Sequence, residues 1–161
     1  FSKLTESGQI LTIILMLIGG SPGSTAGGMK TTTVAVLTST AVSVFRRNEN
    51  PELFKRRIAP ETVANAASIL MMYLCLCLTG AFLISRIEEL PMMACMFETA
   101  SAVGTVGLSF GITPGLGSIS RIILIILMYL GRVGGLTLIY AALSGHRIRF
   151  GKYPLEKITV G

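Results

Sequence analysis

The sequence predicts an all-α integral membrane protein, and three observations carry that prediction. Hydrophobic residues make up 51% of the 161 residues and charged residues only 14%, whereas soluble domains contain about 25% charged residues. The mean hydropathy is correspondingly high, at +0.69. Residues 62–85 contain no charge, and a helix of that length measures ~36 Å, enough to cross a hydrocarbon core of about 30 Å. Two shorter apolar segments each run into a glycine-rich loop.

The first of these loops lies between residues 10–18 and the uncharged segment 31–45. Residues 10–18 cover only about 13 Å as a helix, so we expect a half-helix that enters the membrane and stops at a loop over residues 19–28. A long helix is expected over residues 29–46. It crosses the membrane if it begins near Gly28 and extends towards Arg46.

The same pattern then repeats. We expect a membrane helix over residues 62–86, a half-helix over 91–102, a loop over 104–108 and a long helix over 119–144. The sequence therefore divides into residues 1–58, a copy without its opening helix, and residues 59–161, a complete copy with a C-terminal tail. Because the first copy is incomplete, we expect the sequence to be part of a longer protein.

The charges predict the topology. Basic residues cluster in the connection before the opening helix of the second copy and again after the last span: Arg46, Arg47, Lys55, Arg56 and Arg57, then His146, Arg147, Arg149, Lys152 and Lys157. The positive-inside rule assigns both clusters, and hence the C-terminus, to the cytoplasmic side of a multi-pass protein. This asymmetry accounts for the net charge of +6. Because the basic residues flank spans rather than a soluble face, no nucleic-acid partner is expected.

The glycine-rich loops predict an ion pathway. Irregular backbone in a membrane is tolerated where it is buried in protein or lines a watery cavity, and its carbonyl oxygens can replace the water around a cation. The half-helices direct the partial negative charge of their C-terminal carbonyls towards the loops, which favours a cation. The alternative is that the glycines serve close helix packing. A phosphate-binding loop is not expected, because its Gly-Lys-Ser/Thr ending is absent.

Several motifs in order resemble a known family. Residues 24–33 read STAGGMKTTT, residues 97–98 read FE, residues 101–109 read SAVGTVGLS, residues 131–137 read GRVGGLT and residues 153–161 read YPLEKITVG. Together they resemble the C-terminal half of the Trk/Ktr/HKT potassium-transporter superfamily, and most of all the Ktr-type membrane subunit. One departure is Gly135, where the family pattern has proline.

The resemblance implies a fold and a filter. The fold is a ring of four repeats, each a membrane helix, pore helix, filter loop and membrane helix, of which this sequence supplies most of the third and all of the fourth. The implied K⁺-binding filter residues are Ser24, Thr25, Ala26, Gly27 and Gly28 in the first loop and Gly104, Thr105, Val106, Gly107 and Leu108 in the second.

The resemblance also implies a function, which is K⁺ uptake across the plasma membrane down the electrochemical gradient, rather than an enzymatic activity. The implied partners are a second copy of the membrane chain, as a homodimer, and a cytosolic nucleotide-binding regulatory ring subunit. Whether Na⁺ stimulates the flux, and whether K⁺ is preferred to Na⁺, are left open. The alternative of a different class is a non-conducting membrane scaffold whose glycines pack helices.

Four features carry individual expectations. We expect Glu98 to hold the second loop by hydrogen bonds to its amides; the alternative is that it tunes the field at the filter. Lys30 is expected to contact the scaffold.

Arg132 lies near the bilayer midplane, where a charge costs about 2.5–3.5 kcal/mol. The resemblance implies that it is a pore barrier beneath the filter. The alternative is that it is an anchor on loop carbonyls. The small residues Thr38, Ser39, Thr40 and Ala41 indicate packing or, by the resemblance, a mobile gate.

Overall fold

Five α-helices dominate the computed structural model, which describes residues 4–47, 51–53 and 56–133. Their bounds are α1 Glu6–Leu17, α2 Thr31–Phe45, α3 Pro60–Glu88, α4 Met92–Gly104 and α5 Ser118–Val133. A short antiparallel hairpin lies between α2 and α3. Its two strands, β1 Glu52–Leu53 and β2 Arg56–Arg57, have two residues each. A 3₁₀ turn, Thr113–Gly115, precedes α5.

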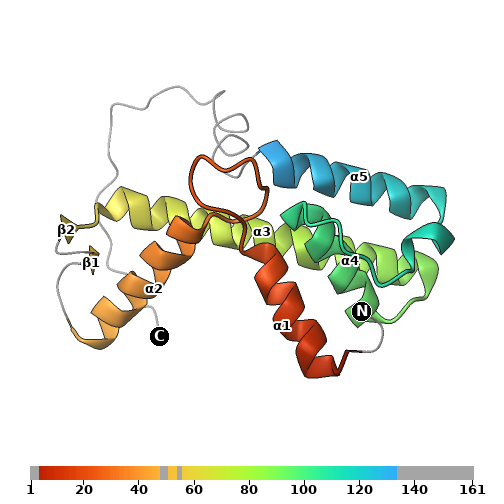
Figure 1. Cartoon of the computed structure of the whole chain (residues 1–161), viewed down its shortest axis with the longest axis horizontal. Helices are drawn as coiled ribbons and strands as arrows, with labels where there is room; N and C mark the ends of the chain where they lie inside the picture. Colours follow the sequence, from red (N-terminus) through yellow and green to blue (C-terminus); the bar gives the residue numbers. More distant parts are fainter. Residues whose placement is uncertain (1–3, 48–50, 54–55, 134–161) are drawn as a thin grey trace, which may run out of the picture.

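Helix α3 is the axis of the structure. It runs along the long dimension of the molecule, with α2 beside its N-terminal part and α4 and α5 beside its C-terminal part (Figure 1). Among the described residues, α3 is the one helix that is long and apolar enough to cross a membrane, whereas α1 and α2 are apolar but shorter. Pro60 at its first turn favours helix initiation, and the left-handed Glu89 followed by Pro91 ends it.

The core lies where α3, α4 and α5 meet. The largest fully buried side chains there include Tyr73 and Ile84 of α3 and Phe97 and Val103 of α4. Phe97 also packs edge-on against Phe110, with ring centroids 4.7 Å apart. Helix α4 is buried over most of its length, so it occupies the centre of the bundle and carries its C-terminus into protein rather than towards an outer face.

The outer faces are strongly apolar. On α5, a row of large side chains is exposed: Ile119, Ile122, Ile125, Ile126 and Tyr129. Exposed apolar side chains in helical rows are typical of a surface that faces lipid or further protein. The mostly helical structure and this surface agree with the predicted class of membrane protein.

The helix bounds differ from the expected ones at several ends. Helix α1 begins at Glu6 rather than residue 10, because Thr5 caps it by accepting a hydrogen bond from the Gly8 amide at 3.3 Å. Helix α2 has 15 residues, about 22 Å, so it does not meet the condition for crossing the membrane. The hairpin was not predicted. The end of the long helix expected over 119–144, the tail and Gly135 lie outside the described residues.

Candidate functional site

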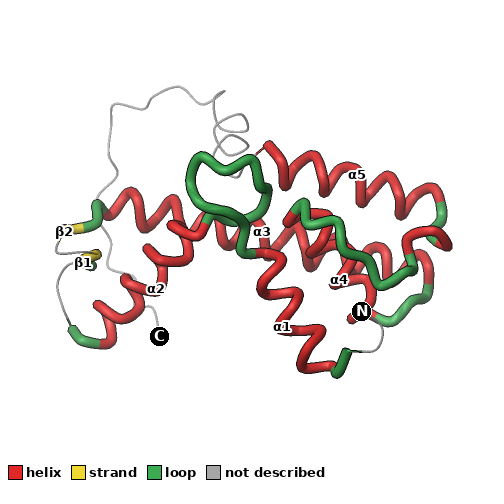
Figure 2. Tube along the Cα trace, viewed as in Figure 1, coloured by secondary structure: helices red, strands yellow, loops and turns green. Residues whose placement is uncertain are grey.

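The first glycine-rich loop is closed at its base. Ile18 and Met29 form an isolated parallel bridge. The Gly19 amide donates to the Met29 carbonyl at 2.6 Å, and the Met29 amide donates to the Leu17 carbonyl at 3.0 Å. These bonds bring the C-terminus of α1 and the N-terminus of α2 side by side, so the residues between them project as a ring-shaped loop (Figure 2).

The second loop leaves the C-terminus of α4 through two left-handed residues. Thr105 has φ 53° and Gly107 has φ 81°. The Val106 amide donates to the Ser101 carbonyl at 3.0 Å, which closes the last turn of α4. Gly104, expected in the loop, is instead the last residue of the helix. The left-handed backbone explains a glycine at 107, because a side chain is strained at that φ.

The two loops meet in space although 78 residues separate them in the chain. The Gly27 amide donates to Thr105 Oγ1 at 2.9 Å. No side chain fits at Gly27, because a Cβ would run into the Thr105 side chain and lie 3.0 Å from the Gly131 carbonyl oxygen. A hollow of about 440 Å³ is lined by both loops and by α1. The structure therefore brings the two predicted filter segments together.

Three successive carbonyl oxygens of the first loop face cationic groups. The Lys30 ammonium donates to the Ser24 carbonyl at 3.0 Å and to the Ala26 carbonyl at 2.7 Å. The Arg132 guanidinium donates to the carbonyl of Thr25, between them. Arg132 comes from the last turn of α5. This stretch of backbone, residues 24–26, thus presents oxygens that cations bind.

Glu98 holds the segment that follows the second loop. This side chain of α4 is only 5% exposed. Its Oε1 accepts from Ser109 Oγ at 2.6 Å and from the Phe110 amide at 2.9 Å, and its Oε2 accepts from Thr113 Oγ1 at 2.9 Å. The expected bonds to amides of loop 104–108 are not among these contacts: Glu98 instead holds the segment that follows the loop, through one amide and two hydroxyls. The sequence analysis did not predict Ser109 and Thr113 as its partners. The signal that could have found them is Glu98 itself, because an acid in an otherwise uncharged half-helix needs hydrogen-bond donors nearby.

A second hollow of about 490 Å³ adjoins this loop. It is lined by parts of α4 and α5 and by loop residues that include Thr105, Gly107, Leu108 and Arg132. Arg132 therefore belongs to the same region as both loops. Among the described residues no cluster of three or more His, Cys, Asp or Glu side chains is arranged to hold a metal ion.

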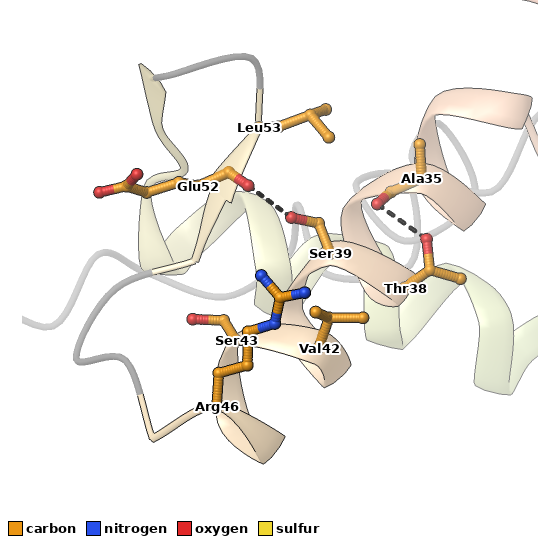
Figure 3. A pocket seen from close by; sticks show the side chains of 8 residues that line it. All are labelled: Ala35, Thr38, Ser39, Val42, Ser43, Arg46, Glu52 and Leu53. Atoms are coloured by element: carbon orange, nitrogen blue, oxygen red, sulfur yellow. Dashed lines mark hydrogen bonds between the residues drawn. The ribbon is translucent and has the colours of Figure 1, made fainter.

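The proposed gate segment lies elsewhere, in the middle of α2. Its residues are helical and continuous with the rest of α2. Thr40 Oγ1 bonds back to the Val36 carbonyl at 2.8 Å. Ser39 Oγ instead donates to the Glu52 carbonyl of β1 at 2.7 Å. A pocket of about 550 Å³ opens here between α2 and the hairpin, and Thr38, Ser39 and Arg46 line it (Figure 3).

Comparison with known proteins places the sequence in a protein family. The sequence model of the TrkH family, described as a cation transport protein, matches residues 1–147. The chain belongs to the TrkH family of cation transport proteins. This membership confirms the predicted resemblance, and it agrees with the expectation that the chain is a transport protein rather than an enzyme.

Individual relatives of this TrkH-family chain are also similar along its length. It is 38% identical over 167 residues to the potassium/sodium uptake protein NtpJ of Enterococcus hirae, covering 100% of the chain and 37% of that relative. It is 33% identical over 161 residues to the Ktr system potassium uptake protein B of Bacillus subtilis, covering 100% and 36%. The corresponding protein of Vibrio alginolyticus is 34% identical over 160 residues, covering 99% and 35%. The chain thus spans little more than a third of the length of these relatives.

Sequence reasoning missed one buried hydroxyl near the loops. Tyr73 of α3 is 2% exposed, and its hydroxyl donates to the Gly131 carbonyl at 3.4 Å. This contact ties α3 to the turn of α5 that carries Arg132. A tyrosine inside an uncharged membrane span is a signal for such a contact, because a buried hydroxyl needs a partner.

Proposed function

We propose that this TrkH-family chain forms part of a K⁺-uptake protein of the plasma membrane, with the two loops as part of a carbonyl-lined selectivity filter. The observation that carries the proposal is the cluster of carbonyls at Ser24, Thr25 and Ala26, which already bind two cationic groups. Beside it lies the second loop, joined through Gly27 and Thr105. The filter residues are those of the two predicted segments, 24–28 and 104–108.

The chemistry follows from dehydration. K⁺ loses most of its water at a narrow constriction, and carbonyl oxygens compensate for that loss. Helix α1 ends at Leu17 and helix α4 at Gly104, so the C-terminal end of each helix dipole points into a loop and favours a cation there. The names of the relatives support K⁺ as the transported ion, with Na⁺ as a second ion.

In the whole protein, residues 1–58 and 59–161 are proposed as the third and fourth of four pore repeats. The basic connection and the C-terminus lie on the cytoplasmic side of a multi-pass protein. The membrane chain forms a homodimer, and a cytosolic nucleotide-binding ring regulates it. The words "Ktr system" in the names of two relatives support a multi-component assembly.

Two further features belong to the proposed ion pathway. Arg132 acts as a barrier in the pore, and residues 38–41 of α2 are a gate segment.

A second candidate function rests on the glycine contacts. A Cβ at Gly104 would collide with the Met16 carbonyl of α1, and one at Gly131 would collide with the Val103 carbonyl of α4. Such contacts are typical of close helix packing. They favour a non-conducting membrane scaffold as the alternative to a transport protein.

Growth of a K⁺-uptake-deficient bacterial strain at limiting K⁺ separates the two functions. The full-length protein is expressed in that strain, and its amount in the membrane is measured by immunoblotting. We expect the wild-type protein to restore growth at limiting K⁺. Failure to restore growth, with the protein folded and present in the membrane, would support the scaffold function.

A further inference from the structure

Lys30 occupies a position at which lysine is electrostatically unfavourable. It is the N-cap residue of α2, its side chain makes no capping hydrogen bond, and the first turn of α2 contains no acidic residue. Helix N-termini carry partial positive charge and favour anions. A residue that breaks such a local rule is expected at functional positions.

The partners of the Lys30 ammonium group are carbonyls of the proposed filter. The half-buried Lys30 side chain folds back so that Nζ lies 3.0 Å from the Ser24 oxygen and 2.7 Å from the Ala26 oxygen. An ammonium group is a compact point charge, close to K⁺ in size. The lysine therefore satisfies the same oxygens that a permeating K⁺ would use in this quarter of the filter.

The segment after the second loop is held in the opposite way. The Glu98 carboxylate accepts hydrogen bonds from donors of the segment that follows, the Phe110 amide and the hydroxyls of Ser109 and Thr113. An acid that holds donors does not compete for carbonyl oxygens, whereas a lysine that holds carbonyls does. Lys30 thus binds carbonyls within the first loop, whereas Glu98 binds donors that lie beyond the second loop.

We infer that Lys30 is a tethered cation that weakens K⁺ binding by the first loop, so that of these two loops the second supplies the stronger ligands. This inference rests on the proposed function. Lys30 competes for the Ser24 and Ala26 oxygens and repels an ion beside them. Weaker binding favours release of the ion, because conduction requires a site that an ion can leave.

The test uses the full-length protein and the variants Lys30→Met and Arg121→Met. Arg121 is the matched control, because its guanidinium also donates to a backbone carbonyl, that of Pro114 at 2.9 Å, outside the loops. Both variants lose one positive charge. The measurements are the K⁺ concentration that half-saturates uptake into proteoliposomes and the concentration that gives half of the K⁺-induced thermal stabilisation in detergent.

We expect Lys30→Met to lower both concentrations by roughly tenfold, which corresponds to about 1.4 kcal/mol of tighter binding, and to lower the maximal uptake rate. Arg121→Met should match the wild type. Unchanged or weaker K⁺ binding in folded Lys30→Met would overturn the inference while leaving K⁺ uptake intact. A wild-type protein without saturable K⁺ uptake would overturn the proposed function, and this inference with it.

Two further variants cover a loss of folding. Lys30→Gln carries no charge but retains an amide donor for one carbonyl, and we expect it to bind K⁺ more tightly than the wild type, by a smaller factor. Lys30→Arg keeps the charge. If both neutral variants fail to fold while Lys30→Arg folds with wild-type K⁺ binding, Lys30 is only a structural clamp and the inference is wrong.

Discussion

Glu98 illustrates how a single side chain fixes the backbone of the candidate site. Both of its carboxylate oxygens accept hydrogen bonds, and all three donors belong to the segment after the second loop. The group is nearly inaccessible to water, so these bonds replace hydration that the buried carboxylate has lost. Hydrogen bonds to a charged group contribute about 1.5–3 kcal/mol each.

Replacing Glu98 with Gln should therefore loosen this segment. The amide retains one acceptor but presents an NH₂ group to partners that now donate to a carboxylate. We expect a loss of about 1–3 kcal/mol in unfolding free energy and faster hydrogen exchange over residues 105–117. Thermal unfolding in detergent and hydrogen-exchange mass spectrometry measure the two effects. Glu61→Gln, at an exposed site in the first turn of α3, is the control, and equal behaviour of the two variants would contradict the role of Glu98.

Arg132 is a second side chain that contacts the backbone of the candidate site. It donates to the Thr25 carbonyl, and its side chain is exposed and lines the hollow beside the second loop. Arg132→Ala frees that carbonyl and removes a positive charge from the proposed pathway. We expect K⁺ uptake per folded protein to rise and to depend less on the cytosolic partner.

The measurement for Arg132→Ala is tracer uptake normalised to folded protein, beside thermal stability. Arg86→Ala, in the exposed last turn of α3, controls for the loss of one positive charge. A lower folded yield with no rise in uptake would identify Arg132 as a structural anchor instead.

At the scale of elements, glycines set how closely the helices approach. Gly131 of α5 lies against the Val103 carbonyl of α4, and Gly104 of α4 lies against the Met16 carbonyl of α1. A side chain at either position would push two helix backbones apart. These contacts bring the last turn of α5, with Arg132, onto the C-terminus of α4, where the second loop begins.

Gly131→Ala should separate α5 from α4. The added methyl group meets backbone atoms of Val103, which cannot move aside as a flexible side chain would, and overpacking of this kind costs about 1–3 kcal/mol. We expect a lower unfolding temperature in detergent. Gly115→Ala is the matched control, since a Cβ there meets nothing within 4 Å. Equal stability of the two variants would contradict close packing at Gly131.

Some elements were predictable because one local signal decides them. The uncharged run predicted α3, and the glycine-rich loops were predicted where apolar segments of half length end. The ends of α1 and α2 were not predictable to the residue, because they depend on the Thr5 cap and on the bridge between Ile18 and Met29. The β1–β2 hairpin was missed, since two-residue strands leave no periodic pattern.

At the scale of the whole molecule, the important feature is the meeting of two loops that are distant in the chain. The sequence predicted each loop, although Gly104, expected in the second loop, ends α4 instead. It did not predict the hydrogen bond from Gly27 to Thr105 or the convergence of Lys30 and Arg132 on three adjacent carbonyls. Such contacts depend on tertiary packing between separate elements, and no pattern of residues within one element encodes them.

In the proposed function, the backbone of these two loops selects the ion. Gly27→Ser inserts a side chain where Thr105 lies, whereas Gly107→Ser places one in open space at φ 81° and so perturbs mainly the backbone. Both changes should redirect carbonyl oxygens and weaken selectivity for K⁺.

The decisive measurement is the ratio of K⁺ to Na⁺ uptake by proteoliposomes that contain full-length wild-type protein, Gly27→Ser, Gly107→Ser or the control Gly115→Ala. We expect the ratio to fall several-fold in both loop variants and to stay at the wild-type value in Gly115→Ala. An unchanged ratio in both folded loop variants would contradict ion selection by the loop backbone.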